Sequence, residues 1–150
     1  MRPAFSVVIF TTLTGAGQGL FLTVYGADVW SRLSALPLNM SSFVSGGAAL
    51  AAVLAILGLA ASFLHLGHPE RAWRAAAMWR TSWLSREVIV LPLFIGACAT
   101  YAWAHQAGSS AAPWIGALAL AACAGLFLCT AMIYMCLRFL QEWASPLTLL

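Results

Sequence analysis

The chain contains no lysine and few charged residues of either sign. Charged side chains make up 7% of its 150 residues and hydrophobic side chains 63%, whereas about 25% of the residues in a soluble domain are charged. This shortage excludes an ordinary soluble domain and indicates an integral membrane protein. The net charge of +3 comes from seven arginines scattered along the chain, which excludes the basic face of a nucleic-acid-binding protein.

The four cysteines lack the spacing of a metal or haem motif. No CxxC or CxxCH pattern is present, and every cysteine falls inside an apolar segment. We therefore expect no metal site and no c-type haem in this chain. The cysteines are interpreted as small buried residues that tolerate helix packing, and they are Cys98, Cys123, Cys129 and Cys136.

The sequence contains long apolar runs. Four of them reach about 20 residues, enough for a helix to cross about 30 Å of hydrocarbon, and strand-period alternation is absent. Because only helices and closed barrels satisfy their backbone in lipid, the sequence predicts an all-α fold, a polytopic transmembrane helical bundle. We expect one membrane-anchor domain over residues 1–150, with spans at about 5–28, 43–64, 88–105 and 113–137. The first span is too long for a signal peptide and should stay in the mature chain.

Charge is concentrated in one connector. Residues 65–87 hold eight of the fourteen Asp, Glu, His, Lys and Arg residues. An interfacial helix is expected at about 69–80, where Pro69 suits the first helical position and the Trp and Arg side chains suit a headgroup boundary. Ser85 is the expected N-cap of the third span, with Glu87 in its first turn. Because a bilayer makes charge expensive, this connector is the expected place for chemistry or for docking a partner.

Arginine counting orients the bundle. Arg2, Arg138 and the four arginines of the connector fall on one side of a four-span bundle, and Arg32 falls on the other. The positive-inside rule then places the N-terminus and the 66–86 connector in the cytoplasm. Arg32 stands four residues after Asp28, which we interpret as a solvated helix-end pair.

Glycines in the first span need a separate interpretation. Residues 14–19 superficially look like a nucleotide loop, but they lie in an apolar span and follow no strand. Gly15 and Gly19 instead form a GxxxG pattern, which predicts a helix-packing face, and Gln18 needs a partner inside the bundle.

The histidines do not favour a b-type haem. His65 ends the second span on the arginine-rich side and His105 ends the third span on the opposite side, about 30 Å away. His65 can exchange protons with a small redox molecule in the lipid, because an imidazole titrates near neutrality. On the residues alone, His65 also fits an interfacial side chain bonded to backbone, and Glu87 also fits a helix-start carboxylate.

Two segments resemble a known family. Residues 64–72 read Leu-His-Leu-Gly-His-Pro-Glu-Arg-Ala and residues 81–87 read Thr-Ser-Trp-Leu-Ser-Arg-Glu. They resemble the HLG-x-P-x-RA and S-x-LS-x-E signature of the dimethyl sulfoxide reductase anchor subunit family (DmsC), which is more distantly NrfD/PsrC-like. Residues 3–19 look most like the anchors of cytoplasmic sulfite dehydrogenases in that family.

The resemblance implies a redox function without haem. Such anchors have about eight spans and exchange electrons between the quinone pool and an iron–sulfur subunit, which serves a molybdopterin catalytic subunit. By motif position, His65 and Glu87 would line the quinone site, with Arg71 and Arg86 beside them. The partner-docking residues would be Arg71, Trp73, Arg74, Trp79 and Arg80.

The resemblance also implies cofactors, a substrate and a location for the whole protein. Iron–sulfur clusters and molybdopterin would belong only to the partner subunits, and ubiquinone or menaquinone would be the substrate, reduced by sulfite oxidation. The location would be the bacterial inner membrane, and about four more helices would follow Leu150. The competing hypothesis is a non-redox assembly or transport module, which co-purification with a molybdenum enzyme would distinguish.

Overall fold

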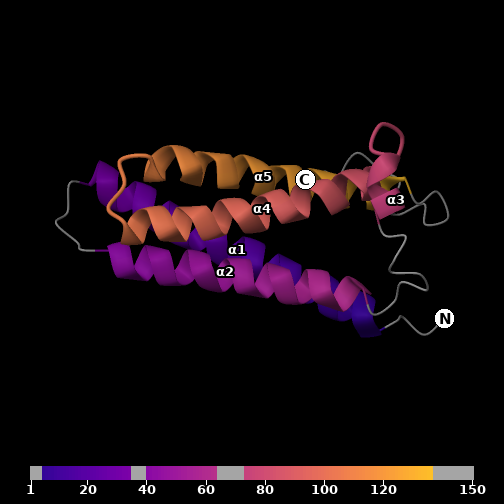
Figure 1. Ribbon diagram of the computed structural model, residues 1–150, viewed down its shortest axis with the longest axis horizontal. Helices are drawn as coiled ribbons and strands as arrows, with labels where there is room; N and C mark the ends of the chain where they lie inside the picture. The colour runs from indigo at the N-terminus through magenta and orange to yellow at the C-terminus, as the bar shows by residue number, and fades with distance from the viewer. Residues whose placement is uncertain (1–4, 35–39, 64–72, 137–150) are drawn as a thin grey trace.

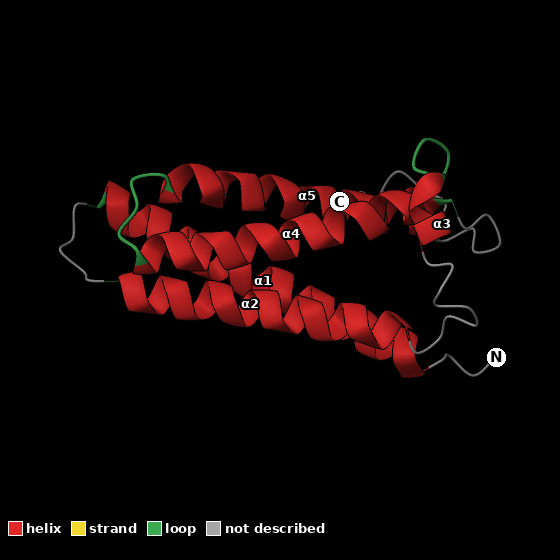
Figure 2. Ribbon diagram, viewed as in Figure 1, coloured by secondary structure: helices red, strands yellow, loops and turns green. Residues whose placement is uncertain are grey.

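The computed structural model describes residues 5–34, 40–63 and 73–136, and the described residues are helical apart from short connections (Figure 1, Figure 2). The five helices are α1 (Phe5–Leu33), α2 (Ser41–Phe63), α3 (Trp73–Ala77), α4 (Trp83–Gln106) and α5 (Ala112–Met135). All but α3 are long and apolar enough to cross a membrane. The expected all-α, polytopic membrane fold is therefore confirmed.

The four long helices run side by side and alternate in direction (Figure 1). α1 packs mainly on α2, α2 on α4, and α4 on α5. The start of α1, the end of α2, α3 and the start of α4 lie at one end, which we call the connector end. The end of α1, the start of α2 and the turn at residues 107–111 lie at the other, which we call the turn end.

Small residues allow α1 and α2 to approach closely. A Cβ atom added to Gly17 would lie 2.9 Å from the backbone oxygen of Ala51, and one added to Gly58 would lie 2.6 Å from the Thr14 hydroxyl. The predicted GxxxG face was wrong, because Gly15 and Gly19 are exposed with nothing within 4 Å of an added Cβ. The buried face of α1 runs through Thr14, Gly17 and Gln18 instead.

Aromatic rings fill the core toward the turn end. Phe21 is fully buried and makes ring contacts with Tyr25, Phe94 and Tyr101. Gly116 lets both tyrosine rings approach α5, since an added Cβ would lie 2.6 Å from Tyr25 and 2.8 Å from Tyr101. Large side chains in this layer and alanines along α2 give a well-packed interior.

The outer surface of the bundle is apolar. Many large hydrophobic side chains are more than one-third exposed on every long helix, including Ile56, Leu93, Leu118 and Phe127. An apolar surface of this extent in water would drive aggregation, whereas lipid chains or further helices can cover it. The exposed apolar surface agrees with the membrane location inferred from composition.

The connector departs from the sequence predictions at two boundaries. Of the helix expected at about 69–80, residues 69–72 lie outside the described part of the chain, and α3 ends at Ala77 and is followed by turns at residues 78–81. Ser82, rather than Ser85, is the N-cap of α4, and its hydroxyl accepts a hydrogen bond from the Ser85 N–H at 3.4 Å. Glu87 is consequently the fifth residue of α4 and lies beyond the first turn.

Candidate functional site

The structure describes only part of the predicted site. His65 and Arg71 lie outside the described residues, and Trp73 is described as the first residue of α3. The remaining candidates are Arg74, Trp79, Arg80, Arg86 and Glu87, and all of them lie at the connector end, between α3 and the first turns of α4.

Arg86 fastens the turn before α4 to the helix. Its Nε donates to the backbone oxygen of Trp79 at 2.9 Å, and its Nη2 donates to that of Arg80 at 3.2 Å. The guanidinium lies 4.0 Å from the centre of the Trp83 ring, within the range of a cation–π contact. A guanidinium has five N–H donors, and the bonds within the described part of the chain use two of them. The role of Arg86 in quinone binding stays a prediction.

An exposed basic and aromatic surface precedes α4, formed by Arg74, Met78, Trp79 and Arg80. All four residues are exposed, and Trp79 keeps 53% of its surface. The Arg80 guanidinium lies 5.4 Å from the centre of the Trp79 ring. Arginine and tryptophan side chains are enriched where proteins bind partners and where membranes meet water, so this surface suits either contact.

Glu87 is half-buried between α4 and α5. Its carboxylate has the Thr130 hydroxyl of α5 as a hydrogen-bonding neighbour, and it lies close enough to the buried Cys129 thiol to interact electrostatically. Arg86 precedes Glu87 directly in α4, so a cation and an anion lie at the same level of the helix. A carboxylate held in this way can accept or return a proton, because it is shielded from water but has a polar neighbour.

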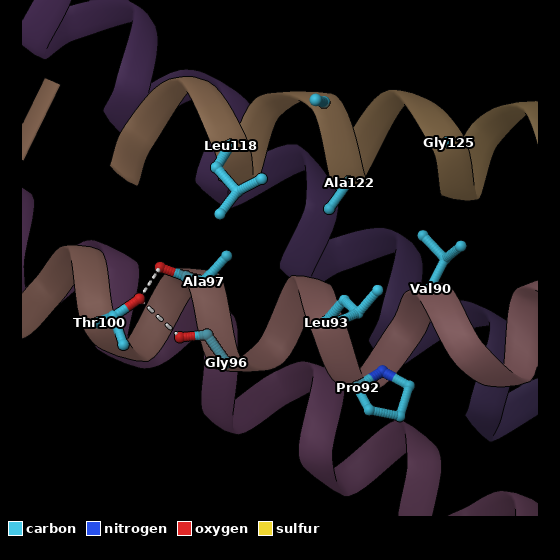
Figure 3. Close-up of a pocket in the computed structure, with 10 residues that line it drawn as sticks. Val90, Pro92, Leu93, Gly96, Ala97, Thr100, Leu118, Ala122 and Gly125 are labelled. Carbon is cyan, nitrogen blue, oxygen red and sulfur yellow. Dashed lines mark hydrogen bonds between the residues drawn. The ribbon is translucent and has the colours of Figure 1, made fainter. Parts of the chain in front are cut away.

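An apolar groove begins close to Glu87, one helical turn further along α4. It has a volume of about 530 Å³ and lies between α4 and α5, from Val90 and Gly125 to Thr100 and Leu118 (Figure 3). The Thr100 hydroxyl donates to the backbone oxygens of Gly96 and Ala97 at 2.9 and 3.0 Å, so it offers the groove little polarity. Pro92 also lines the groove within α4. The groove can accommodate an apolar chain that lies along the bundle.

A second polar cluster lies at the turn end, where the sequence predicted only a solvated pair. The Arg32–Asp28 ion pair is present, with Arg32 Nε 3.0 Å from Asp28 Oδ2, but Asp28 is only 5% exposed. Its carboxylate also accepts a 2.7 Å hydrogen bond from the Tyr101 hydroxyl, and His105 Nε2 lies 3.4 Å away. The prediction that this pair is solvated was therefore wrong for Asp28.

The buried face of α1 could have revealed this cluster. Asp28 follows Phe21 by seven residues and Val24 by four, the spacing that keeps side chains on one helix face. His105 lies at the turn end, in the last turn of α4, as the topology argument expected. Among the described residues, no group of three or more His, Cys, Asp and Glu side chains could hold a metal ion.

Comparison with known proteins agrees with the family resemblance of the two sequence segments. The profile of the DMSO reductase anchor subunit (DmsC) family matches residues 1–150. A sulfite dehydrogenase subunit from Allochromatium vinosum is 50% identical to this chain over 161 aligned residues, which cover 99% of the chain and 50% of that relative. The chain thus spans about half the length of the curated relative it matches. No solved structure matches the chain.

Proposed function

The chain belongs to the DMSO reductase anchor subunit (DmsC) family, and we propose that it is the quinone-reactive membrane anchor of a molybdopterin oxidoreductase complex. In this proposal, electrons pass between an iron–sulfur subunit docked at the connector end and a quinone in the lipid. The observation that carries the proposal is Glu87, a half-buried carboxylate inside a membrane-spanning helix, next to Thr130 and one turn from an apolar groove. Carboxylates in membrane helices are rare, and they mark ion or proton sites.

The proposed reaction needs protons as well as electrons. Quinone takes up two electrons and two protons to become quinol, and both protons must reach a headgroup that is shielded from water. Glu87 would hold one of them in position, and His65, which lies outside the described residues, would supply protons from the membrane surface, because an imidazole exchanges protons near neutral pH. Arg86 and Arg71, which lies outside the described residues, would bind the quinone oxygens.

The proposed electron source is sulfite. Its oxidation to sulfate takes an oxygen atom from water and releases two electrons and two protons, which matches the two electrons that one quinone accepts. The name of the relative from Allochromatium vinosum supports this direction of electron flow. Molybdopterin and iron–sulfur clusters would both belong to partner subunits.

The proposed docking surface for the iron–sulfur subunit is the exposed set formed by Arg74, Trp79 and Arg80, together with Arg71 and Trp73. The exposure of Arg74, Trp79 and Arg80 supports docking, because buried arginines would not be free for a partner. The proposed location is the bacterial inner membrane, and the arginine count supports an orientation in which the N-terminus and the 66–86 connector face the cytoplasm.

The test compares two electron acceptors in the assembled complex. Membranes that carry the Glu87→Gln variant should lose quinone-coupled sulfite oxidation and keep oxidation by an artificial dye that accepts electrons from the catalytic subunits. Thr23→Val is the control, since its exposed hydroxyl donates to the Gly19 backbone oxygen of α1 and Thr23 does not line the groove. Equal loss of both activities would show that Glu87 supports assembly, and unchanged quinone kinetics would refute its role in the quinone site.

A further inference from the structure

The polar cluster at the turn end directs three side chains at a single oxygen atom. Asp28 Oδ2 accepts a hydrogen bond from the Tyr101 hydroxyl at 2.7 Å and another from Arg32 Nε at 3.0 Å, and it faces His105 Nε2 at 3.4 Å. These contacts join α1 to α4 across the bundle. With three polar neighbours this close, the oxygen has little space for a larger ligand.

His105 is the member of the cluster whose buried Nε2 makes no hydrogen bond. Its side chain is 8% exposed, its ring packs edge-on against Tyr101 at 4.7 Å between centroids, and its Nε2 has no hydrogen-bond partner. The 3.4 Å between Nε2 and Asp28 Oδ2 is longer than a good hydrogen bond, so the neutral ring gains little from the carboxylate. Protonation makes both ring nitrogens donors and gives the ring a charge opposite to that of Asp28.

The charges around His105 are nearly balanced before the proton arrives. On α1, Asp28 and Arg32 carry opposite charges, and Tyr25 contributes a neutral ring that touches Tyr101. α2 contributes the Ser41 hydroxyl, which donates to the backbone oxygen of His105 at 2.7 Å, and α5 contributes Gly116 against the two tyrosine rings. Asp28 attracts a proton on His105 and Arg32 opposes it, so the two residues act in opposite directions.

An aromatic layer separates the cluster from the middle of the bundle. Phe21 and Phe94 are fully buried, contact each other edge to face, and lie between Asp28 and the nearest buried polar side chain of α1, Gln18. On the other side, the Arg32 side chain is 44% exposed. The cluster therefore reaches the bundle surface through Arg32, and the rings separate it from the polar side chains nearer the connector end.

We propose that Asp28, Tyr101 and His105 form a proton-binding site at the turn end, in which a proton taken up by His105 turns its contact with Asp28 into an ion pair and so fastens α4 to α1. Tyr101 and Arg32 hold the carboxylate in place for this contact, and water at the turn end supplies the proton. The site does not depend on quinone binding, because it lies at the opposite end of the bundle from Glu87.

Nitrogen NMR of the ¹⁵N-histidine-labelled full chain in lipid nanodiscs tests this proposal. The chain contains three histidines, so the spectrum is simple, and a His105→Gln variant assigns the His105 signals. We expect these signals to report protonation as the pH is lowered. Asp28→Asn should weaken proton binding by His105 about tenfold or more, and Arg32→Gln should strengthen it by a similar factor.

The opposite signs of the two variants separate proton binding from simple support of the fold. Arg32→Gln replaces a half-exposed side chain, so it remains informative if Asp28→Asn fails to fold. His68→Gln is the control and should leave the His105 signals unchanged. A His105 ring that stays neutral at every pH at which the protein is folded would overturn the proposal, and so would a titration that Arg32→Gln does not move.

Discussion

The two ends of the bundle accommodate charge in different ways. At the turn end, a buried carboxylate has a tyrosine and an arginine as hydrogen-bond donors, and all of these partners belong to α1 and α4. At the connector end, Arg74 and Arg80 are exposed and Glu87 is half-buried beside the Thr130 hydroxyl. Charge in a membrane protein is tolerated when it is paired internally or when it serves a ligand or partner. The turn end thus pairs its buried charge internally, whereas the exposed charge at the connector end agrees with the external contacts proposed above.

The largest expected effect comes from His65→Ala at the connector end. Loss of the imidazole should abolish quinone-coupled turnover, because a positioned general acid contributes about 10²–10⁴-fold to proton transfer. Turnover with an artificial dye and assembly of the complex should remain. Steady-state assays with a quinone and with the dye on the same membranes provide the measurement. If both activities disappear together, the connector end has a structural role and the comparison fails.

Glu87→Gln should have the next largest effect. The amide keeps the size of the side chain but cannot transfer a proton, so quinone turnover should fall about a hundredfold. Thr130→Val should have a smaller effect in the same direction, since it removes only the hydroxyl neighbour of the carboxylate. Rates measured at saturating quinone separate this loss from weaker binding. Wild-type rates in the Glu87→Gln variant would contradict a role of this carboxylate in proton transfer to the quinone.

Substitution of Gly17 tests whether the two ends belong to one tightly packed bundle. Gly17→Leu places side-chain atoms against the backbone of Ala51 and should destabilise the protein by about 1–3 kcal/mol, as overpacking does. Gly15→Leu is the matched control, because its Cβ position is open. Thermal unfolding of both variants in the same detergent gives the comparison. Equal melting temperatures would contradict the close approach of α1 and α2.

Arg80→Ala should weaken partner docking by a modest amount. An exposed interface charge typically contributes about 0.2–1 kcal/mol and acts mainly on the association rate. The expected result is slower association with the iron–sulfur subunit, with a difference from wild type that shrinks as salt is added. Surface-immobilised binding at two ionic strengths measures it. An association rate unaffected at low salt would remove Arg80 from the docking surface.

The smallest effect on quinone turnover is expected from Tyr101→Phe at the turn end. Glu87 and Tyr101 are fourteen residues apart on α4, about 21 Å along the helix, and distant sites act almost independently. Quinone turnover should therefore stay within about twofold of wild type. The same assays as for Glu87→Gln provide the measurement. A large loss would show that the two ends are coupled and that they do not have separate roles.

The presence of the membrane helices was predictable from the sequence. The buried face of each helix and the residue at which it begins were harder to predict. Apolar runs of span length predict membrane helices because lipid offers the backbone no hydrogen bonds. The glycine pattern at Gly15 and Gly19 predicted the wrong face, because glycine spacing alone does not reveal which side meets a neighbour. The sequence offered Ser85 as the N-cap, but Ser82 is an equally suitable cap and is the one that α4 uses.

The candidate site was predicted in part. The connector stands out because most of the charge lies there, and the signature residues Ser82, Ser85 and Glu87 come from the resemblance to the family. The proximity of Thr130 and Cys129 to Glu87 was not predictable, because some forty residues separate them in the chain. Asp28 was interpreted as solvated because its only sequence neighbour of opposite charge is Arg32, whereas Tyr101 and His105 approach it from another helix.

Composition, span length and arginine placement determined by themselves that the chain is an all-α membrane protein with one charged connector, since these are properties of segments in a bilayer solvent. The two signature motifs indicated the family to which the chain belongs, and the match over residues 1–150 confirmed it. Only the tertiary structure decided which polar groups meet, such as Asp28 with Tyr101 and Glu87 with Thr130. The physical reason is that helix rotation and pairing depend on packing between distant segments, and a linear pattern of apolar residues leaves both open.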